Sequence, residues 1–211
     1  MELTVRASEC SKMMTASRSK SQPLSETTLT WLKEKAVEAI IGHRKDISNK
    51  YMEKGILVEQ KSIDLLNSVL FTDYKKHDKR INTEGFTGEC DILEKDHVRD
   101  IKSSWSVDTF PFFVDDAEKA VKKSGYDWQV RMYMILYGVD KAYVDYCLVS
   151  TPEDLIGWES AEMHNVDNIE VTKRVTTVEI LRDEEKEKQI IEKYMLCNEQ
   201  FKAYISELKN K

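Results

Sequence analysis

The chain has 211 residues, of which 41% are hydrophobic, an ordinary composition for one compact domain spanning residues 1–211. Its 32 basic and 38 acidic residues give a formal net charge of −6 at pH 7, which excludes a uniformly basic coat for polyanions. No run approaches the roughly 20 apolar residues of a membrane span, and residues 1–6 lack a signal-peptide core, so we expect a cytoplasmic protein without membrane association.

A short helix and a longer one are expected near the N-terminus. Ser8 precedes a helical pattern that runs to Thr15, and its hydroxyl is placed to cap the first turn. Because anions also bind well at a helix N-terminus, Ser8 is either a plain cap or a phosphate ligand. The next helix is expected from Ser25 to about Ile41, with Gly42 as its stop signal.

A long helix is expected from about Asp46 to Leu70, because apolar residues recur along this segment at helical spacing. Gly55 lies inside it at a cost of up to ~1 kcal/mol relative to alanine, which suggests that another backbone or a ligand approaches closely there. Glu59 lies one turn later on the same side and could face that ligand. A solvated surface glutamate is the competing interpretation, and for Glu59 alone it is the favoured one.

Residues 88–102 hold two short apolar runs joined by a polar stretch, residues 94–97, and this pattern predicts an inner β-hairpin. Asp100 and Lys102 are two residues apart, so both side chains point to the same face of their strand. If the reversal contains an even number of residues, Asp91 lies opposite Asp100 on that face. Like charges directly across a ladder are destabilising, so this pair needs a bound cation or a raised pKa on one carboxyl.

These residue types suit metal-assisted phosphodiester hydrolysis. Carboxylate oxygens with few accompanying His or Cys side chains are ligands for Mg²⁺ or Mn²⁺. Lys102 beside such an ion can hold or polarise a water molecule or a phosphate oxygen. The competing interpretation is an Asp-x-Lys sequence that faces water, and on the tripeptide alone it is favoured.

The segment from Tyr126 to Tyr137 is apolar almost all round, which predicts a well-buried helix. Gln129 stands out within it, and Tyr133 lies one turn later on the same face. A buried amide must find hydrogen-bond partners. Gln129 is therefore either satisfied internally or in contact with the hairpin lysine, a water molecule or DNA.

The remaining elements are predicted from their patterns alone. Residues 103–113 form an aromatic segment that we expect to be mainly core, with a DNA channel as the alternative. Strands are expected at 142–149 and 174–181, with a helix at 152–163 between them. Residues 183–209 predict an amphipathic helix whose apolar stripe packs on its own domain or on another subunit.

Taken together, the acidic, lysine and glutamine positions follow the order found in the PD-(D/E)XK nucleases: Glu59, Asp91, Asp100, Lys102, Gln129 and Tyr133. More narrowly, the chain resembles the phage lambda exonuclease-like, or YqaJ viral recombinase, branch. Residues 6–9 are similar to the early Ala-Ser element of that branch, and the resemblance covers about residues 5–150. Two positions depart from the common pattern: Cys90 replaces the proline of the family name, and Asp100 stands where many members have glutamate.

This resemblance implies a restriction-endonuclease-like α/β core, with a mixed sheet flanked by helices on both faces. It also implies two Mg²⁺ or Mn²⁺ ions, whose ligands would be Asp91, Asp100, the carbonyl of Ile101, and Glu59. Lys102 would activate the attacking water, and Gln129 would orient Lys102 or a metal-bound water. Contacts to DNA would come from Ser8, which binds a phosphate, together with Arg6 and Tyr133.

The implied activity is Mg²⁺-dependent exonuclease action on double-stranded DNA ends, 5′→3′, which generates single strands for phage-type recombination. Implied partners are the DNA ends, a single-strand annealing protein and further copies of the chain in a trimeric ring. The alternatives are another nuclease of the superfamily, such as an endonuclease or a RecB-like module, and a catalytically silent DNA-binding module. The intact acid–acid–lysine set argues against a catalytically silent module.

The four cysteines and four histidines are too scattered for an iron–sulfur or zinc site.

Overall fold

Two mixed β-sheets form the framework of the computed structural model, which describes residues 1–19, 21–45 and 48–211. The larger sheet has the order β4 (Ile92–Leu93), β5 (His97–Ser103), β6 (Lys141–Cys147), β7 (Val175–Leu181). The smaller sheet has the order β1 (Val5–Arg6), β3 (Phe86–Gly88), β2 (Ile81–Asn82). The β1–β3 and β5–β6 pairs are parallel, and the other pairs are antiparallel.

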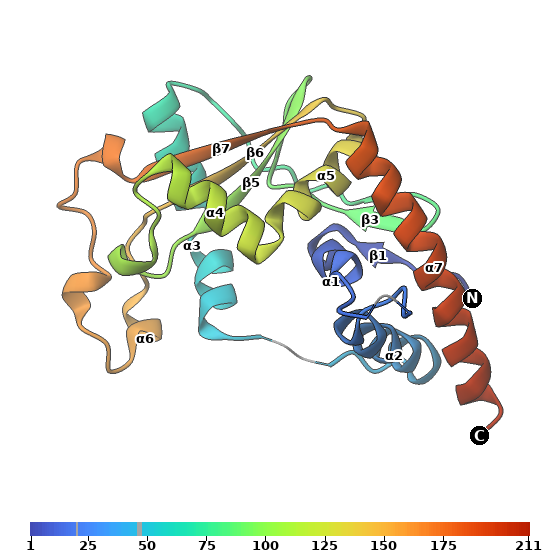
Figure 1. The fold of residues 1–211 in the computed structure, drawn as a ribbon. Helices are drawn as coiled ribbons and strands as arrows, with labels where there is room; N and C mark the ends of the chain where they lie inside the picture. The colour runs from blue at the N-terminus through green and yellow to red at the C-terminus, as the bar shows by residue number, and fades with distance from the viewer. Residues whose placement is uncertain (20, 46–47) are drawn as a thin grey trace.

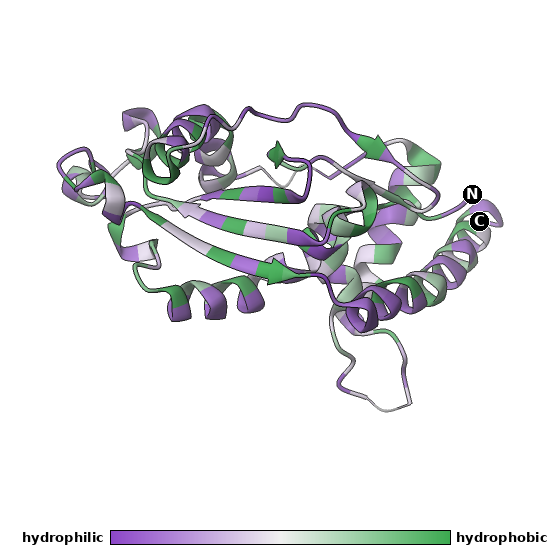
Figure 2. Ribbon diagram, turned by 90° about the horizontal axis from the view of Figure 1, so that it is seen from above, coloured by the Kyte–Doolittle hydropathy of each residue, from purple (hydrophilic) through white to green (hydrophobic). Residues whose placement is uncertain are grey.

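Helices cover both faces of the larger sheet, as the sequence predicts. In Figure 1, α3 (Lys50–Leu70) lies behind this sheet, whereas α4 (Val114–Ser124) and α5 (Tyr126–Tyr137) lie in front of it. The period-two pleat of β5 sends Val98 into the core shared with α5, and Ile101 into the cluster shared with α3. Figure 2 shows the resulting alternation of hydrophilic and hydrophobic positions along the strands. The larger sheet is therefore buried on both faces.

A second group of helices packs beside the smaller sheet (Figure 1). It consists of the 3₁₀ turn η1 (Ala7–Glu9), α1 (Cys10–Met14), α2 (Glu26–Ile41) and α7 (Glu184–Lys209). The last helix holds the N-terminal strand, because Leu3 N donates to Asn198 Oδ1 (2.9 Å) and Tyr194 OH donates to Leu3 O (3.1 Å).

The caps of α2 confirm the sequence prediction for that helix. Ser25 Oγ accepts from Thr28 N (3.1 Å) at its start, and Gly42 adopts the left-handed φ of 73° at its end. The strand predicted at 174–181 and the helix predicted at 183–209 are also confirmed, with bounds shifted by one residue. The predicted start of the long helix, Asp46, lies outside the described residues, and α3 begins at Lys50 after the Asn49 cap.

Two local predictions are wrong. Ser8 does not cap a helix: it lies inside η1, because Arg6 takes the cap position and the Glu9 carboxylate accepts from Arg6 N (3.4 Å). The helix expected over 152–163 shrinks to α6 (Glu153–Ile156) and the 3₁₀ turn η3 (Ala161–Met163), because Gly157 interrupts it with a φ of 65°.

The aromatic segment after β5 divides between core and surface. Trp105 and Phe110 are buried, in agreement with the expected core role, whereas Phe112 and Phe113 are 45% and 69% exposed. Two further 3₁₀ turns complete the described elements: η2 (Val107–Thr109) and η4 (Val171–Lys173). Among the described residues, no helix is both long and apolar enough to cross a lipid bilayer.

Candidate active site

The β4–β5 hairpin places the two aspartates as the strand period predicts. Leu93 pairs with Val98 across a four-residue reversal, and continuing this register by two residues places Asp91 opposite Asp100. Asp91 Oδ2 accepts a hydrogen bond from Ile101 N (2.5 Å). The two carboxylates therefore share one face at the base of the hairpin.

Asp100 is held by a cation and an amide. It is 2% exposed, its Oδ2 lies 2.6 Å from Lys102 Nζ, and its Oδ1 accepts from Gln129 Nε2 (2.9 Å). Burial alone would lower the pKa of the Lys102 ammonium, but the Asp100 and Asp91 carboxylates raise it above its usual value. Lys102 is consequently a charged ammonium at neutral pH, and the ring of Tyr126 lies 4.2 Å from it.

Asp91 carries the electrostatic cost of this arrangement. Its burial, followed by the nearby charge of Asp100, raises its pKa from 3.8 to about 7, although Lys102 and the Ile101 N–H act in the opposite direction. Two carboxylates held together in this way are stabilised by a proton or by a bound cation. The raised pKa is thus the physical sign that the pair fits a divalent metal ion with hard oxygen ligands.

Asp91→Asn is expected to stabilise the metal-free protein at about pH 8. The folded state holds the Asp91 proton more tightly than the unfolded chain does, so this carboxyl lowers stability progressively as the pH rises from about 4 to about 7. Asparagine cannot ionise and can still accept from Ile101 N, so we expect a gain of roughly 2–4 kcal/mol. Denaturant unfolding in EDTA measures it. The gain must shrink toward about pH 4, and a loss at about pH 8 would contradict the charge conflict.

Gln129 is buried on α5 and uses its amide as the sequence predicts. Its Nε2 donates to Asp100 Oδ1 and to Tyr133 OH (3.0 Å), and its Oε1 lies 3.4 Å from Lys102 Nζ. The single amide therefore fixes the positions of the aspartate, the lysine and the tyrosine. Tyr133 OH accepts from Gln129, which leaves its own proton available for another acceptor.

Glu59 lines the same site, but its carboxylate is turned toward Lys76. Its carboxylate forms an ion pair and hydrogen bond with Lys76, from the segment that follows α3. Within the part of the chain that the structure describes, no three His, Cys, Asp or Glu side chains converge closely enough to hold a metal ion. Asp91 and Asp100 could therefore contribute carboxylate oxygens to a metal site, whereas Glu59 would first have to leave Lys76.

A cavity of about 410 Å³ unites the predicted site residues. Its lining includes these members of the predicted set: Ser8, Glu59, Asp91, Asp100, Ile101, Lys102, Gln129 and Tyr133. Arg6 is the exception, because it lines a neighbouring cavity of about 710 Å³, where its Nη2 lies 3.3 Å from Glu38 Oε1. Ser8 is exposed and lines both cavities, so it marks their shared rim.

Gly55 also lines the acidic cavity, but no backbone packs against it. A Cβ atom added there would meet no other heavy atom within 4 Å. Of the two explanations offered by the sequence, close approach of another backbone is therefore wrong. The glycine instead widens the cavity beside Glu59.

Sequence reasoning missed two residues of the site. Lys76 pairs with Glu59, but it follows at no regular spacing after the helix, so no local pattern identifies it. Tyr126, which contacts the Lys102 ammonium, lies one helical turn before Gln129. Its position on the glutamine helix was a usable signal for a site residue.

Comparisons with known proteins bear on the fold and the family. No protein-family model and no curated protein matches the chain. Among solved structures, a phage-related exonuclease from Haemophilus somnus 129PT is 33% identical, with a TM-score of 0.92, and the match covers 99% of this chain and 97% of that one. An alkaline exonuclease (LHK-Exo) from Laribacter hongkongensis is 15% identical, with a TM-score of 0.68 over 98% of this chain and 92% of that one.

The second likeness supports the fold alone, because the identity is low. The first extends the resemblance beyond residues 5–150, where the sequence motifs lie, to nearly the full chain including the C-terminal third. Fold, motif order and overall sequence identity therefore agree. The chain belongs to the family of phage-related exonucleases, in the lambda exonuclease-like branch of the PD-(D/E)XK nucleases.

Proposed function

We propose that the protein is a Mg²⁺-dependent exonuclease that degrades double-stranded DNA from its ends. The observation that carries this proposal is the pairing of half-buried Asp91 with buried Asp100, with Lys102 and Gln129 against Asp100, at the wall of an open cavity. The chain's membership of an exonuclease family supports phosphodiester hydrolysis as the reaction class. A silent DNA-binding module would have no use for a carboxylate pair whose charges destabilise the fold.

Asp91, Asp100 and the Ile101 carbonyl would hold one divalent ion, Mg²⁺ or Mn²⁺, and Glu59 would hold a second after releasing Lys76. When bound, the ions would activate a water nucleophile and neutralise charge on the attacking and leaving oxygens of the phosphodiester. The carboxylate pair, in which the pKa of Asp91 is raised, and the partly exposed Glu59–Lys76 ion pair are compatible with such a binding step. Because Asp91 binds a proton up to about pH 7, protons compete with the ions below that pH.

The other side chains have roles that follow from their charge and contacts. Lys102 is an ammonium, so it attracts and orients a water or phosphate oxygen and does not itself accept the water's proton. Gln129 fixes the positions of Asp100 and Lys102 through hydrogen bonds. Tyr133 can donate its proton to a phosphate oxygen, and Ser8 at the cavity rim would bind a neighbouring phosphate.

We further propose 5′→3′ polarity, production of single strands for phage-type recombination, a ring of identical subunits and an annealing partner. The motif resemblance supports these points, and the phage-related exonuclease that shares the fold supports only the link to phage. An endonuclease with the same site is the competing function, because the acid–lysine set alone does not distinguish ends from internal bonds.

The decisive experiment is digestion of linear duplex DNA labelled at either the 5′ or the 3′ end, with Mg²⁺ or with EDTA. We expect early release of the 5′ label as small products, retention of the 3′ label in long fragments, and no release in EDTA. A covalently closed duplex serves as the control and must stay intact. Cutting of the closed duplex would identify an endonuclease, and early release of the 3′ label would reverse the polarity.

A further inference from the structure

Lys54 is a buried lysine that the chemistry described above does not use. It lies in α3 and is 1% exposed. Its Nζ donates to three main-chain carbonyls, those of Ser104 (2.5 Å), Trp105 (3.1 Å) and Val149 (2.9 Å). Burial lowers the pKa of Lys54 to about 8, whereas the three carbonyl oxygens favour its charged form. All three donors of the ammonium are therefore used inside the protein.

The three carbonyls lie just beyond the ends of the two central strands, since β5 ends at Ser103 and β6 ends at Cys147. A buried carbonyl without a partner costs free energy, and past the end of a strand the ladder cannot supply one. Lys54 provides that partner from the helix behind the sheet. It acts as a cationic cap on the carboxyl ends of two strands at once.

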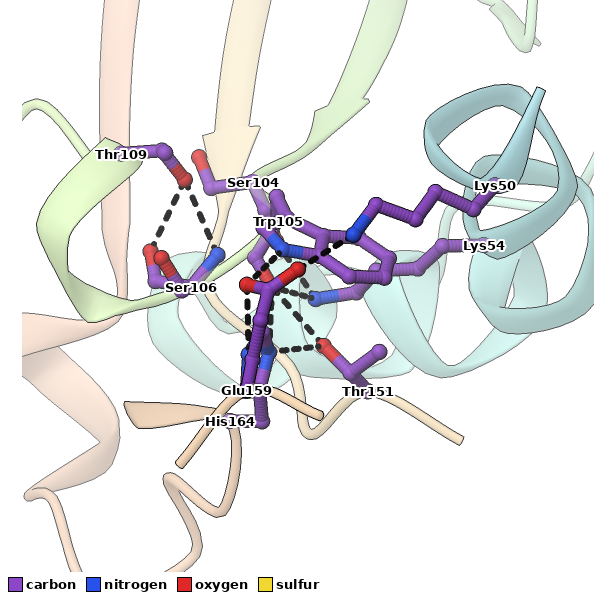
Figure 3. A network of polar contacts seen from close by, with 9 residues as sticks. All are labelled: Lys50, Lys54, Ser104, Trp105, Ser106, Thr109, Thr151, Glu159 and His164. Atoms are coloured by element: carbon purple, nitrogen blue, oxygen red, sulfur yellow. Dashed lines mark hydrogen bonds and ion pairs between the residues drawn. The ribbon is translucent and has the colours of Figure 1, made fainter. Parts of the chain in front are cut away.

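A network of polar contacts fixes the same corner of the molecule (Figure 3). Trp105 Nε1 donates to Glu159 Oε2 (2.9 Å), and the Trp105 carbonyl also accepts from Thr151 Oγ1 (2.8 Å). Glu159 forms an ion pair with Lys50, the first residue of α3. The start of the helix and the segment that follows β5 are thus joined at both Lys50 and Lys54.

A second contact between α3 and the segment that follows Lys102 (we call this contact and that of Lys54 the two ties) lies further along the helix. Lys54 and Ser62 are two helical turns apart, and Ser62 Oγ lies 2.9 Å from Ser103 Oγ. Both ties reach the chain immediately after Lys102, and Glu59 lies between them on α3. The two contacts that flank Glu59, together with the packing of Val58 in the cluster that includes Ile101, therefore help to hold Glu59 near Asp100 and Lys102.

We propose that Lys54 is a positioning residue that holds the Glu59 segment of α3 beside the Asp91–Asp100 pair, so that Glu59 can reach a divalent ion there once it leaves Lys76. This role rests on the proposed metal-dependent nuclease function. Lys54 touches neither the substrate nor the ions and acts through the placement of α3. Partners that orient metal ligands from outside typically change metal affinity by about 10- to 100-fold when they are removed.

The test compares Lys54→Met with Lys61→Met, which removes the same charge from an exposed position of the same helix. Nucleotide release is measured against Mg²⁺ concentration, and Mn²⁺ binding is measured by calorimetry without DNA, both well below the melting temperature. For Lys54→Met we expect the half-saturating Mg²⁺ concentration to rise about tenfold, with the rate at saturating Mg²⁺ within about threefold of the original. Lys61→Met should match the original protein.

A melting temperature that falls while metal dependence stays unchanged would show that Lys54 is only structural, and this would overturn the proposal. If Lys54→Met fails to fold, Ser62→Ala removes the second tie at smaller cost and should raise the half-saturating Mg²⁺ concentration about two- to threefold. No change in that variant would also overturn the proposal. If the original protein releases no nucleotides with Mg²⁺, the proposed function itself fails, and this outcome is separate from an unchanged variant.

Discussion

Asp100→Asn is expected to lower Mg²⁺-dependent nucleotide release by about 1,000-fold or more. Asparagine keeps the shape of the side chain and an oxygen that can accept from Gln129 Nε2, so the fold should survive. It removes the charge that pairs with Lys102 and would bind the divalent ion. Loss of several kcal/mol of transition-state stabilisation corresponds to a rate loss of this size.

Asp96→Asn is the matched control for this substitution. Asp96 lies in the same hairpin with its side chain 66% exposed, and it pairs with His97 and Lys141 at the surface. Release of end label from linear duplex, with circular dichroism to verify folding, should separate the two variants. If folded Asp100→Asn degraded DNA at the original rate, Asp100 would have no part in the reaction.

Lys102→Gln is expected to change rate and metal affinity in opposite directions. Removing the ammonium takes away the group that would orient a phosphate oxygen or water, so the rate at saturating Mg²⁺ should fall about 100-fold. The same change leaves Asp91 and Asp100 without their neighbouring cation. Their uncompensated negative charge should bind Mn²⁺ or Mg²⁺ more tightly.

Calorimetry with Mn²⁺ and single-turnover digestion at saturating Mg²⁺ measure these two effects separately. Lys141→Gln, at the half-exposed first residue of the adjacent strand β6, should leave both unchanged. A variant that only damaged the fold would weaken metal binding as well as the rate. Weaker Mn²⁺ binding by folded Lys102→Gln would therefore contradict its placement against the carboxylate pair.

The sequence alone was sufficient for the centre of the site because that centre is local. The even reversal and the period-two pleat place Asp91, Asp100 and Lys102 on one face without any knowledge of the rest of the fold. The polarity of Gln129 within an apolar helix was equally informative, because a buried amide needs partners. In each case one short-range rule determines the position of a side chain.

The sequence did not reveal which partner Arg6, Glu59 and Ser8 compete with or for in the folded chain. Arg6 was expected to contact DNA at the site, but Glu38 of α2 holds it in the adjoining cavity. Glu59 is paired with Lys76, which no spacing rule connects to it. The expected cap at Ser8 was lost to a short-range competitor, because Glu9 satisfies the turn from the other side. Which partner a side chain takes depends on the residues that the folded chain brings close to it, and spacing along the sequence does not reveal them.

The hydrogen bonds between α7 and the segment at Leu3, just before β1, have a consequence for biosynthesis. Leu3 is hydrogen-bonded to Asn198 and Tyr194, and Ser8 follows five residues later on the rim of the acidic cavity. During translation the ribosome makes α7 after every other element of the described fold. A nascent chain that ends before α7 lacks the two hydrogen bonds that hold Leu3, so the segment that leads to Ser8 gains this anchor only after Tyr194 and Asn198 have emerged.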